Sequence, residues 1–234
     1  MCERGRVKCR ACNSFHLKTF IDLGLSPIAN NLLAKEDLDK SELFLPLHVL
    51  TCEDCSLVQL PNISSREILF PDNYTYYSSF SETWLAHCRS YSKEMIEKLG
   101  LTGDDLVVEI ASNDGYMLQY FREAGIQVLG VEPAAHVAKV AMEEREVPTV
   151  VEFFGEETSR KLALSGKKPR LMIANNVLAH VPDLNDFVAG FASLIADDGL
   201  ISYEFPHLLN LLLLNQFDTI YHEHFSYLSL YTVS

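Results

Sequence analysis

The chain has 234 residues, of which 48% are hydrophobic, and it carries a formal net charge of −13. This length allows one large domain or two small ones, and the acidic charge argues against general binding to nucleic acid. The first ten residues are polar and basic rather than a secretory signal, and no apolar run approaches the roughly 20 residues of a membrane span. We therefore expect a cytoplasmic protein with no nucleic-acid partner and no membrane partner.

The first predicted element is a metal-binding domain over residues 1–70. Two Cys-x-x-Cys pairs mark it: Cys9, Cys12, Cys52 and Cys55. Each pair places two thiolates on one tight turn, which suits half of a tetrahedral zinc site, and the residues around the second pair predict a hairpin. Four cysteine ligands leave no open position for catalysis, so we expect a structural zinc; redox-active or simply buried cysteines are the alternative. Glycine and proline predict a loop over residues 22–31.

Three tyrosines follow within four residues: Tyr74, Tyr76 and Tyr77. Each offers an apolar face and a hydroxyl group, so they could line a pocket, although a packed linker is the simpler interpretation. A helix is predicted over residues 81–99, because Ser81 suits its N-cap, apolar residues recur at helical spacing and Gly100 ends it.

The stretch 106–118, LVVEIASNDGYML, combines a buried strand, a tight polar loop and the start of a helix. The next predicted strand, residues 127–131, ends at Glu132, whose carboxylate can accept the hydroxyl groups of a ribose. The phosphate fingerprint Gly-x-Gly-x-x-Gly is absent, and Asp114 would repel a nearby pyrophosphate. A ligand with a ribose and no phosphate fits better, and S-adenosylmethionine (SAM) is such a ligand. The alternative is an ordinary strand–helix–strand unit with a surface glutamate.

Further strands are predicted at residues 149–151, 171–174 and 200–205, alternating with helices. This alternation predicts an α/β fold with a doubly wound, parallel sheet in a domain over residues 71–234. Ligands lie outside the carboxyl ends of such strands. Candidate cofactor-binding residues near those ends are Glu109, Asn113, Asp114, Gly115, Glu132, Phe153 and Asn175. Phe153 and Phe154 either sandwich a base or belong to the core.

The last unusual stretch contains Tyr221, His222, Glu223 and His224. In an extended strand the two histidines would share one face, whereas in a turn most of the four side chains could converge. A metal site would need a third ligand, so acid–base chemistry is the better use of these groups. Polar residues satisfied at a seam between domains are the alternative.

Together the two Cys pairs and the motifs VEIASNDG (108–115), NNVLAHVPD (175–183), EFPH (204–207) and YHEHFSY (221–227) resemble the SAM-dependent sugar C-methyltransferases. The resemblance covers essentially the whole chain. It implies an N-terminal zinc module and a central Rossmann-like SAM domain, with nucleotide-linked deoxysugars as substrates. Members of this family also have a third domain, so the chain is expected to be truncated at its C-terminus, and a full-length member is expected to be a monomer.

The same resemblance implies a mechanism and a set of site residues. A base removes the proton at C3 of a 4-keto-deoxysugar, and the resulting enolate attacks the SAM methyl group. His224 is expected to be the base, supported by Tyr221 and Glu223, while His180 and Tyr76 hydrogen-bond the sugar or the enolate oxygen. For SAM, the expected ligands include Asn113, Asp114 and Gly115, with Glu132 on the ribose and Asn175 near the methionine end. The zinc would lie on Cys9, Cys12, Cys52 and Cys55.

Two other functions stay open at this point. One is a SAM-dependent O-methyltransferase acting on another small molecule; amino acceptors are disfavoured because Asn/Asp-Pro-Pro-Tyr is missing after the fourth strand. The other is a truncated zinc- and SAM-binding protein without catalytic activity. An NAD-linked enzyme is disfavoured because the loop lacks Gly-x-Gly-x-x-Gly.

Overall fold

The computed structural model describes residues 7–29, 32–62, 76–164, 166 and 168–234. By its contacts the chain divides into two compact units. Unit 1 comprises Met1–Pro71, Leu178–Asn185 and Phe205–Ser234, and unit 2 comprises Asp72–Val177 and Asp186–Glu204. The domain boundary expected at residue 70 stays a prediction, and Tyr74 lies outside the described residues.

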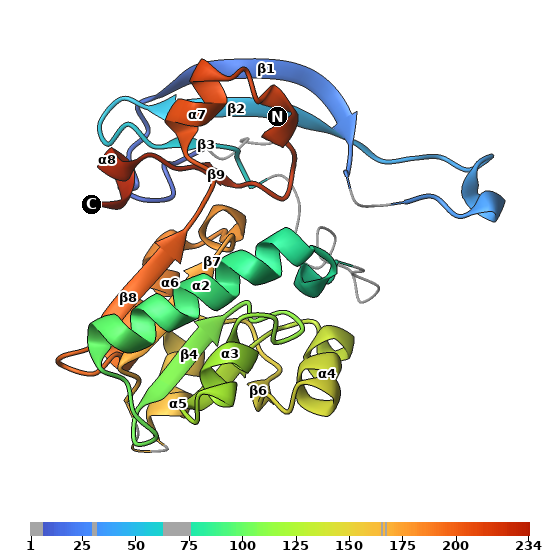
Figure 1. The fold of residues 1–234 in the computed structure, drawn as a ribbon. Helices are drawn as coiled ribbons and strands as arrows, with labels where there is room; N and C mark the ends of the chain where they lie inside the picture. The colour runs from blue at the N-terminus through green and yellow to red at the C-terminus, as the bar shows by residue number, and fades with distance from the viewer. Residues whose placement is uncertain (1–6, 30–31, 63–75, 165, 167) are drawn as a thin grey trace. The chain divides into compact units, whose positions relative to one another are not determined.

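Unit 1 is built on a four-stranded antiparallel sheet in the order β1-β2-β3-β9 (Figure 1). Its strands are β1 (Leu17–Pro27), β2 (Phe44–Cys52), β3 (Val58–Gln59) and β9 (Ser226–Tyr227). The hairpin predicted around the second Cys pair is confirmed, since β2 pairs with β3. The fourth strand comes from near the C-terminus, where Tyr227 pairs with Val58.

The loop predicted over residues 22–31 is wrong for its first part, because β1 continues to Pro27 and pairs with β2 as far as Phe44. The register shifts between Asp22 and Leu25, where Gly24 has a φ of +75°. A bulge therefore takes up the glycine without ending the strand. Proline is tolerated at the end of β1 because β1 is an edge strand.

The remaining elements of unit 1 are short: η1 (Lys35–Asp37), η3 (Leu178–His180), α7 (Leu208–Leu213), η4 (Phe217–Thr219) and α8 (Leu230–Val233). Its buried core joins residues from distant parts of the chain: Leu47, Val49, Val58, Leu60, Ile220 and Tyr227. The segment that carries the YHEHFSY motif thus packs into the same core as the strands beside the cysteines.

Unit 2 contains a five-stranded parallel sheet in the order β6-β5-β4-β7-β8, which confirms the predicted fold class. Its strands are β4 (Leu106–Ile110), β5 (Gln127–Val131), β6 (Thr149–Val150), β7 (Leu171–Asn175) and β8 (Leu200–Glu204). From β4 the chain first builds outward through β5 and β6 and then crosses back to β7 on the other side. The strand order therefore reverses between β4 and β7, and ligands bind at the carboxyl ends next to such a point.

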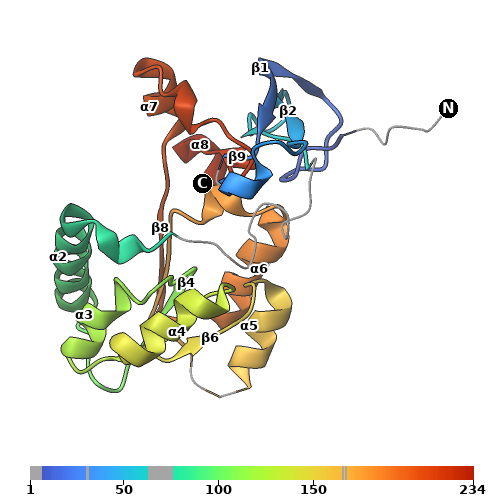
Figure 2. The same cartoon turned by 90° about the vertical axis from the view of Figure 1, so that its right-hand side faces the viewer.

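Helices cover both faces of this sheet (Figure 2). They are α2 (Glu82–Leu99), α3 (Leu118–Glu123), α4 (Ala135–Glu144), α5 (Glu156–Ala163) and α6 (Leu184–Leu194), and the short η2 (Ser78–Phe80) precedes α2. Residues of α2, α3 and α4 share one core with β4 and β7. Helices α5 and α6 contact each other through a hydrogen bond from the Ser159 hydroxyl group to the Gly190 carbonyl oxygen.

The predicted limits of α2 are confirmed. The Ser81 hydroxyl oxygen accepts a hydrogen bond from the Trp84 amide, and Gly100 ends the helix in the left-handed conformation. None of the helices in the described part of the chain combines the length and apolar character needed to cross a membrane.

Candidate functional site

In unit 2 the loop after β4 meets the end of β5 through Glu132. One carboxylate oxygen of Glu132 accepts a hydrogen bond from the Asn113 amide at 3.0 Å, and the other accepts one from the Ala134 amide at 2.8 Å. Burial raises the pKa of Glu132, while the two backbone amides oppose that shift. Each carboxylate oxygen can accept a second hydrogen bond, so the expected contact with ribose hydroxyl groups remains chemically open and stays a prediction.

The Asn113 side chain holds the segment that precedes α2. Its carbonyl oxygen accepts a hydrogen bond from the Ser78 amide at 2.9 Å, and its NH₂ group donates one to the Tyr76 carbonyl oxygen at 3.1 Å. Asn113 adopts a φ of +49°, a conformation that asparagine tolerates better than most residues. The predicted SAM loop therefore fixes the backbone position of Tyr76, whose side chain is exposed.

Asp114 is placed differently from the sequence-based expectation. Its carboxylate is 1% exposed, accepts a hydrogen bond from the Ser79 hydroxyl group and lies 3.4 Å from the Arg145 guanidinium. Because the negative charge of Asp114 is buried and paired, its repulsion of a nearby pyrophosphate is weaker than the sequence suggested. Nothing in the sequence pointed to Arg145 as its partner.

Two further predicted residues lie at or near the strand ends. The amide nitrogen and oxygen of Asn175, the last residue of β7, are buried and have no hydrogen-bond partner among the described residues. Buried polar atoms are normally paired, so Asn175 fits a site that a polar ligand completes. Glu109 is fully buried within β4, and burial raises its pKa well above the usual range, as do the nearby Asp114 and Glu132 carboxylates to a smaller extent.

The two phenylalanines after β6 lie in different environments. The Phe154 ring contacts the rings of Phe187 and Phe191 at centroid distances of 5.6 and 4.9 Å, so Phe154 belongs to the core. Phe153 is 44% exposed, so the core interpretation is wrong for this residue. Its contact with an adenine base stays a prediction.

Gly115 is expected to be indispensable for the SAM loop. It has a φ of +78°, and an added Cβ would lie 3.2 Å from the Val147 side chain and 3.3 Å from that of Ala141. We predict that Gly115→Ala costs about 1–3 kcal/mol of stability and weakens SAM binding, because both the backbone and the packing must change. Calorimetric titration with SAM and thermal unfolding measure the two effects.

Gly125→Ala is the matched control for this prediction. Gly125 has a similar φ of +81°, but an added Cβ would have no neighbour within 4 Å. It should therefore cost only the backbone strain and leave SAM affinity unchanged. Equal losses of affinity in the two variants would contradict the importance of the loop packing around Gly115.

In unit 1 the YHEHFSY motif forms a turn rather than an extended strand at its beginning, since the His224 amide donates to the Tyr221 carbonyl oxygen at 3.0 Å. The His224 ring then has a partner on each nitrogen. Nδ1 lies 2.8 Å from the Thr219 carbonyl oxygen, and Nε2 lies 3.0 Å from the Tyr221 hydroxyl group. A carbonyl oxygen can only accept, so Nδ1 carries the proton and Nε2 presents its lone pair to the phenol.

His180 lies against this pair, with its ring centroid 4.7 Å from that of His224. Burial lowers the pKa of His180 to about 3, helped by His224, and burial also lowers the pKa of His224. Both imidazoles are therefore neutral near pH 7. His224 lines a small hollow together with Ala179, Thr219 and Tyr227, so this ring is not sealed in the core.

His222 and Glu223, which lie between Tyr221 and His224 in the motif, are also buried. His222 Nε2 lies 3.3 Å from the Leu45 carbonyl oxygen. Both nitrogens of His224 are occupied without Glu223, whose supporting role stays a prediction. Thr219 could not be predicted as a site residue, because it acts through its backbone carbonyl group.

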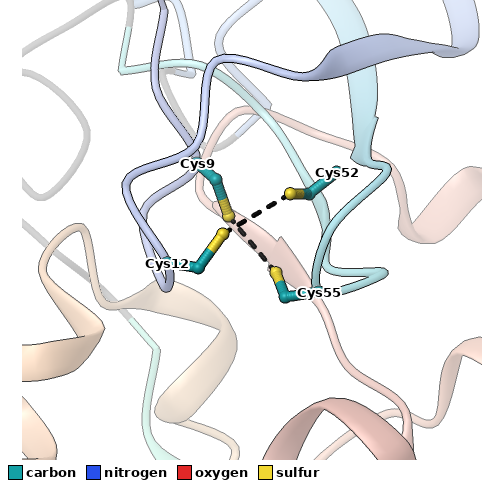
Figure 3. Close-up of side chains that lie close together, drawn as sticks. All are labelled: Cys9, Cys12, Cys52 and Cys55. Atoms are coloured by element: carbon teal, nitrogen blue, oxygen red, sulfur yellow. Dashed lines mark hydrogen bonds between the residues drawn. The ribbon is translucent and has the colours of Figure 1, made fainter.

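The four cysteines of the two Cys pairs come together as predicted (Figure 3). We call the turn Cys9–Cys12 the first knuckle and the turn Cys52–Cys55 the second knuckle. The four sulfur atoms all lie within 4.8 Å of one another, and all four thiols are free of disulfide bonds. Four sulfurs at about 2.3 Å from a tetrahedral zinc would be roughly 3.8 Å apart, which this cluster matches. In the described part of the chain, these four cysteines are the group of at least three possible metal ligands that lie close together. The histidines of the YHEHFSY motif do not belong to this group.

The two knuckles share the same backbone conformation and hydrogen bond. In the first, the Asn13 amide donates to the Cys9 carbonyl oxygen, and Asn13 has a φ of +61°. In the second, the Ser56 amide donates to the Cys52 carbonyl oxygen, and Ser56 has a φ of +63°. Each left-handed residue turns the chain directly after its Cys pair, so that both thiols of a pair face the same point.

A parallel sheet of this order, with a short loop lacking the phosphate fingerprint and a buried acid after the second strand, defines the class of SAM-dependent methyltransferases. Comparison with known families agrees. The chain belongs to the family described as "Methyltransferase domain", which matches residues 79–233, and the family described as "Putative zinc binding domain" matches residues 9–70.

Among curated proteins, the C-methyltransferase NovU of Streptomyces niveus is 40% identical over 223 residues, which cover 95% of this chain and 53% of NovU. The chain thus spans about half the length of this relative. A solved SAM-dependent methyltransferase from Archaeoglobus fulgidus has a TM-score of 0.50 and 19% identity over 64% of this chain and 65% of its own. At that identity it supports the fold alone. DesVI of Streptomyces venezuelae matches with a TM-score of 0.45 and 14% identity over 55% and 53% of the two chains.

Proposed function

We propose that this chain takes part in SAM-dependent C-methylation at C3 of a nucleotide-linked 4-keto-deoxysugar, by way of an enolate. The observation that carries the proposal is the geometry of His224, whose Nδ1–H donates to the Thr219 carbonyl oxygen and whose Nε2 accepts a hydrogen bond from the Tyr221 hydroxyl group. Such a group is suited to remove a proton from carbon. The relation to NovU, a C-methyltransferase, supports carbon as the acceptor atom.

The base in this proposal is the Tyr221–His224 pair. The proton from C3 ends on His224 Nε2, either directly or through the Tyr221 oxygen as the phenol passes its own proton to the imidazole. The Thr219 carbonyl oxygen stabilises the imidazolium that forms, because it accepts from Nδ1–H at 2.8 Å. The lowered pKa of His224 keeps it unprotonated and ready at neutral pH.

The enolate oxygen needs hydrogen-bond donors, because a C–H bond beside a ketone is only weakly acidic. We assign this role to His180, as a neutral N–H donor, and to the Tyr76 hydroxyl group. The pKa of His180, lowered by burial to about 3, excludes a cationic donor at neutral pH. His180 therefore stabilises the oxyanion by hydrogen bonding and not by a full positive charge.

For the methyl donor, the chain offers Glu132, the loop 113–115 and the unpartnered amide of Asn175. When bound, SAM supplies an electrophilic methyl group on its sulfonium. The buried amide of Asn175 and the backbone held by Glu132 support a polar ligand with a ribose at this place. Glu109 and Phe153 complete the proposed set, Phe153 through its exposed ring on the adenine side.

The test uses a panel of 4-keto-6-deoxy nucleotide sugars in two arms. Without SAM in deuterium oxide, exchange at C3 isolates the base; with labelled SAM, label should appear on carbon. Transfer to a hydroxyl group without C3 exchange would replace the proposal with an O-methyltransferase. Measured SAM binding with neither exchange nor transfer would favour a protein that binds zinc and SAM without catalysis.

A further inference from the structure

Arg10 lies between the two cysteines of the first knuckle, and its guanidinium donates hydrogen bonds to oxygen atoms elsewhere in unit 1. One guanidinium nitrogen donates to the Pro182 carbonyl oxygen at 2.7 Å. The other donates to the Leu60 carbonyl oxygen at 2.5 Å and to the Asn62 side-chain oxygen at 2.9 Å. The carbon of the guanidinium lies 5.1 Å from the centroid of the Phe225 ring, within the range of a cation–π interaction.

These partners are the immediate neighbours of the two paired histidines. Pro182 follows His180 by two residues, and Phe225 follows His224 directly. The segments are also tied to each other, because the Phe225 amide donates to the Ala179 carbonyl oxygen at 2.8 Å. The Arg10 guanidinium therefore contacts the chain directly after His224 and two residues after His180.

Further hydrogen bonds close the arrangement within unit 1. The Leu60 amide donates to the Phe225 carbonyl oxygen at 2.9 Å, and the Asn185 side chain donates to the Ala11 carbonyl oxygen at 3.0 Å. The Arg10 amide itself donates to the Gln59 side-chain oxygen at 3.0 Å. The first knuckle, the end of β3, the segment 178–185 and the start of β9 thus form one closed hydrogen-bonded ring.

We propose that Arg10 is a positioning residue that sets the His180–His224 pair from within the metal-binding knuckle. Because Arg10 is part of the Cys9–Cys12 turn, the geometry of the knuckle determines where the guanidinium donates. The first knuckle then has a second role besides offering metal ligands, since its turn carries the guanidinium that contacts the segments next to the two imidazoles. The importance of this positioning for catalysis rests on the proposed function, whereas the positioning itself does not.

The main test is amide hydrogen exchange on the zinc-loaded chain, comparing Arg10→Gln with the natural sequence. We expect protection of the Leu60 and Phe225 amides to fall by about tenfold or more, while the amides that pair β1 with β2 keep theirs. Zinc content and SAM affinity should be unchanged. The imidazole NMR signals of His180 and His224 should shift, which a general loss of stability would not produce selectively.

Two variants and one addition sharpen this test. Arg10→Lys keeps the charge but not the planar fork, so we expect the same local loss of protection. Millimolar guanidinium added to Arg10→Ala should restore protection at Phe225. Lys18→Gln is the matched control: Lys18 is an exposed cation paired with Glu53 of the second knuckle, and its loss should change none of these readouts.

Unchanged protection and unchanged imidazole signals in Arg10→Gln would overturn the proposal. So would loss of zinc, or loss of protection spread evenly over β1 and β2, since either would make Arg10 a stabiliser of the metal site or of the whole unit. None of these measurements uses an acceptor substrate. If the natural chain shows no C3 exchange, the proposed function fails while the role of Arg10 is still decided.

Discussion

Replacing His224 with alanine should abolish deuterium exchange at C3 of the keto sugar, with a fall of about 10²–10⁴-fold, which is the usual contribution of a positioned general base. The variant removes the imidazole nitrogen that accepts a hydrogen bond from the Tyr221 hydroxyl group. NMR detection of exchange without SAM measures this step alone. Retained exchange would reassign the role of the base.

Two companion variants define what the loss means. His16→Gln removes an exposed histidine of unit 1 and should leave exchange unchanged. Tyr221→Phe keeps the imidazole but removes the phenol. If it abolishes exchange as fully as His224→Ala, the proton leaves the sugar through the Tyr221 oxygen; if exchange survives, the imidazole takes it directly. SAM affinity should be the same in all three proteins, because the residues proposed to hold SAM lie in unit 2.

The pH dependence of exchange follows from the direction of the His224 shift. Burial lowers its pKa below the usual value near 6.5, so the neutral, proton-accepting form persists at pH values where an exposed histidine is already charged. The exchange rate should therefore stay level as the pH falls to 6.5 and decline only below it. A decline centred above pH 6.5 would contradict the buried, neutral imidazole.

The parallel sheet could be predicted because each of its strands is an apolar run followed by polar residues at a fixed edge. The limits of α2 could be predicted because Ser81 and Gly100 act locally, through a side-chain cap and a left-handed backbone. The Cys pairs were equally informative, since their spacing alone puts two thiols on one turn. In all these cases the signal and the structure involve residues close together in the sequence.

The features that could not be predicted depend on contacts between residues distant in the sequence, for which a single sequence carries little signal. The pairing of β9 with β3 joins Tyr227 to Val58 through two-residue strands. Two further contacts also depend on how the folded chain packs. Asp114 pairs with Arg145, and the Nδ1–H group of His224 donates to the Thr219 carbonyl oxygen. Residues 22–27 of the loop expected over residues 22–31 are strand, because edge pairing with β2 outweighs the local preference of Gly24 and Pro27, whereas residues 30–31 lie outside the described residues.

The placement of the histidines in unit 1 changes what zinc is expected to do. From the sequence, the metal belonged to one domain and the acid–base residues to another. In the structure, His180 and His224 lie in the same compact unit as the four cysteines. The strand that follows His224, β9, pairs with β3, the strand that follows the second Cys pair. Loss of the metal should therefore affect proton removal from the acceptor before it affects binding of the methyl donor.

Cys9→Ser tests that order of effects. Removing one of four thiolates should lower bound zinc from about one per chain to a small fraction, because structural zinc sites bind with apparent free energies on the order of 10 kcal/mol that also stabilise the fold. Unit 1 should then lose hydrogen-exchange protection along β2 and β3, and C3 exchange should disappear with it. SAM affinity should change by less than about twofold, since Glu132 and Asn113 are held by hydrogen bonds within unit 2.

Cys88→Ala is the matched control, because Cys88 is a buried free thiol on α2 in unit 2. It should leave zinc content and C3 exchange unchanged, and any loss of stability should fall on unit 2. Metal analysis, exchange and SAM titration on the two variants separate the units by their response. Unaltered zinc in Cys9→Ser would remove Cys9 from the metal site, whereas lost zinc with full C3 exchange would separate the knuckles from the histidines and refute the link through unit 1.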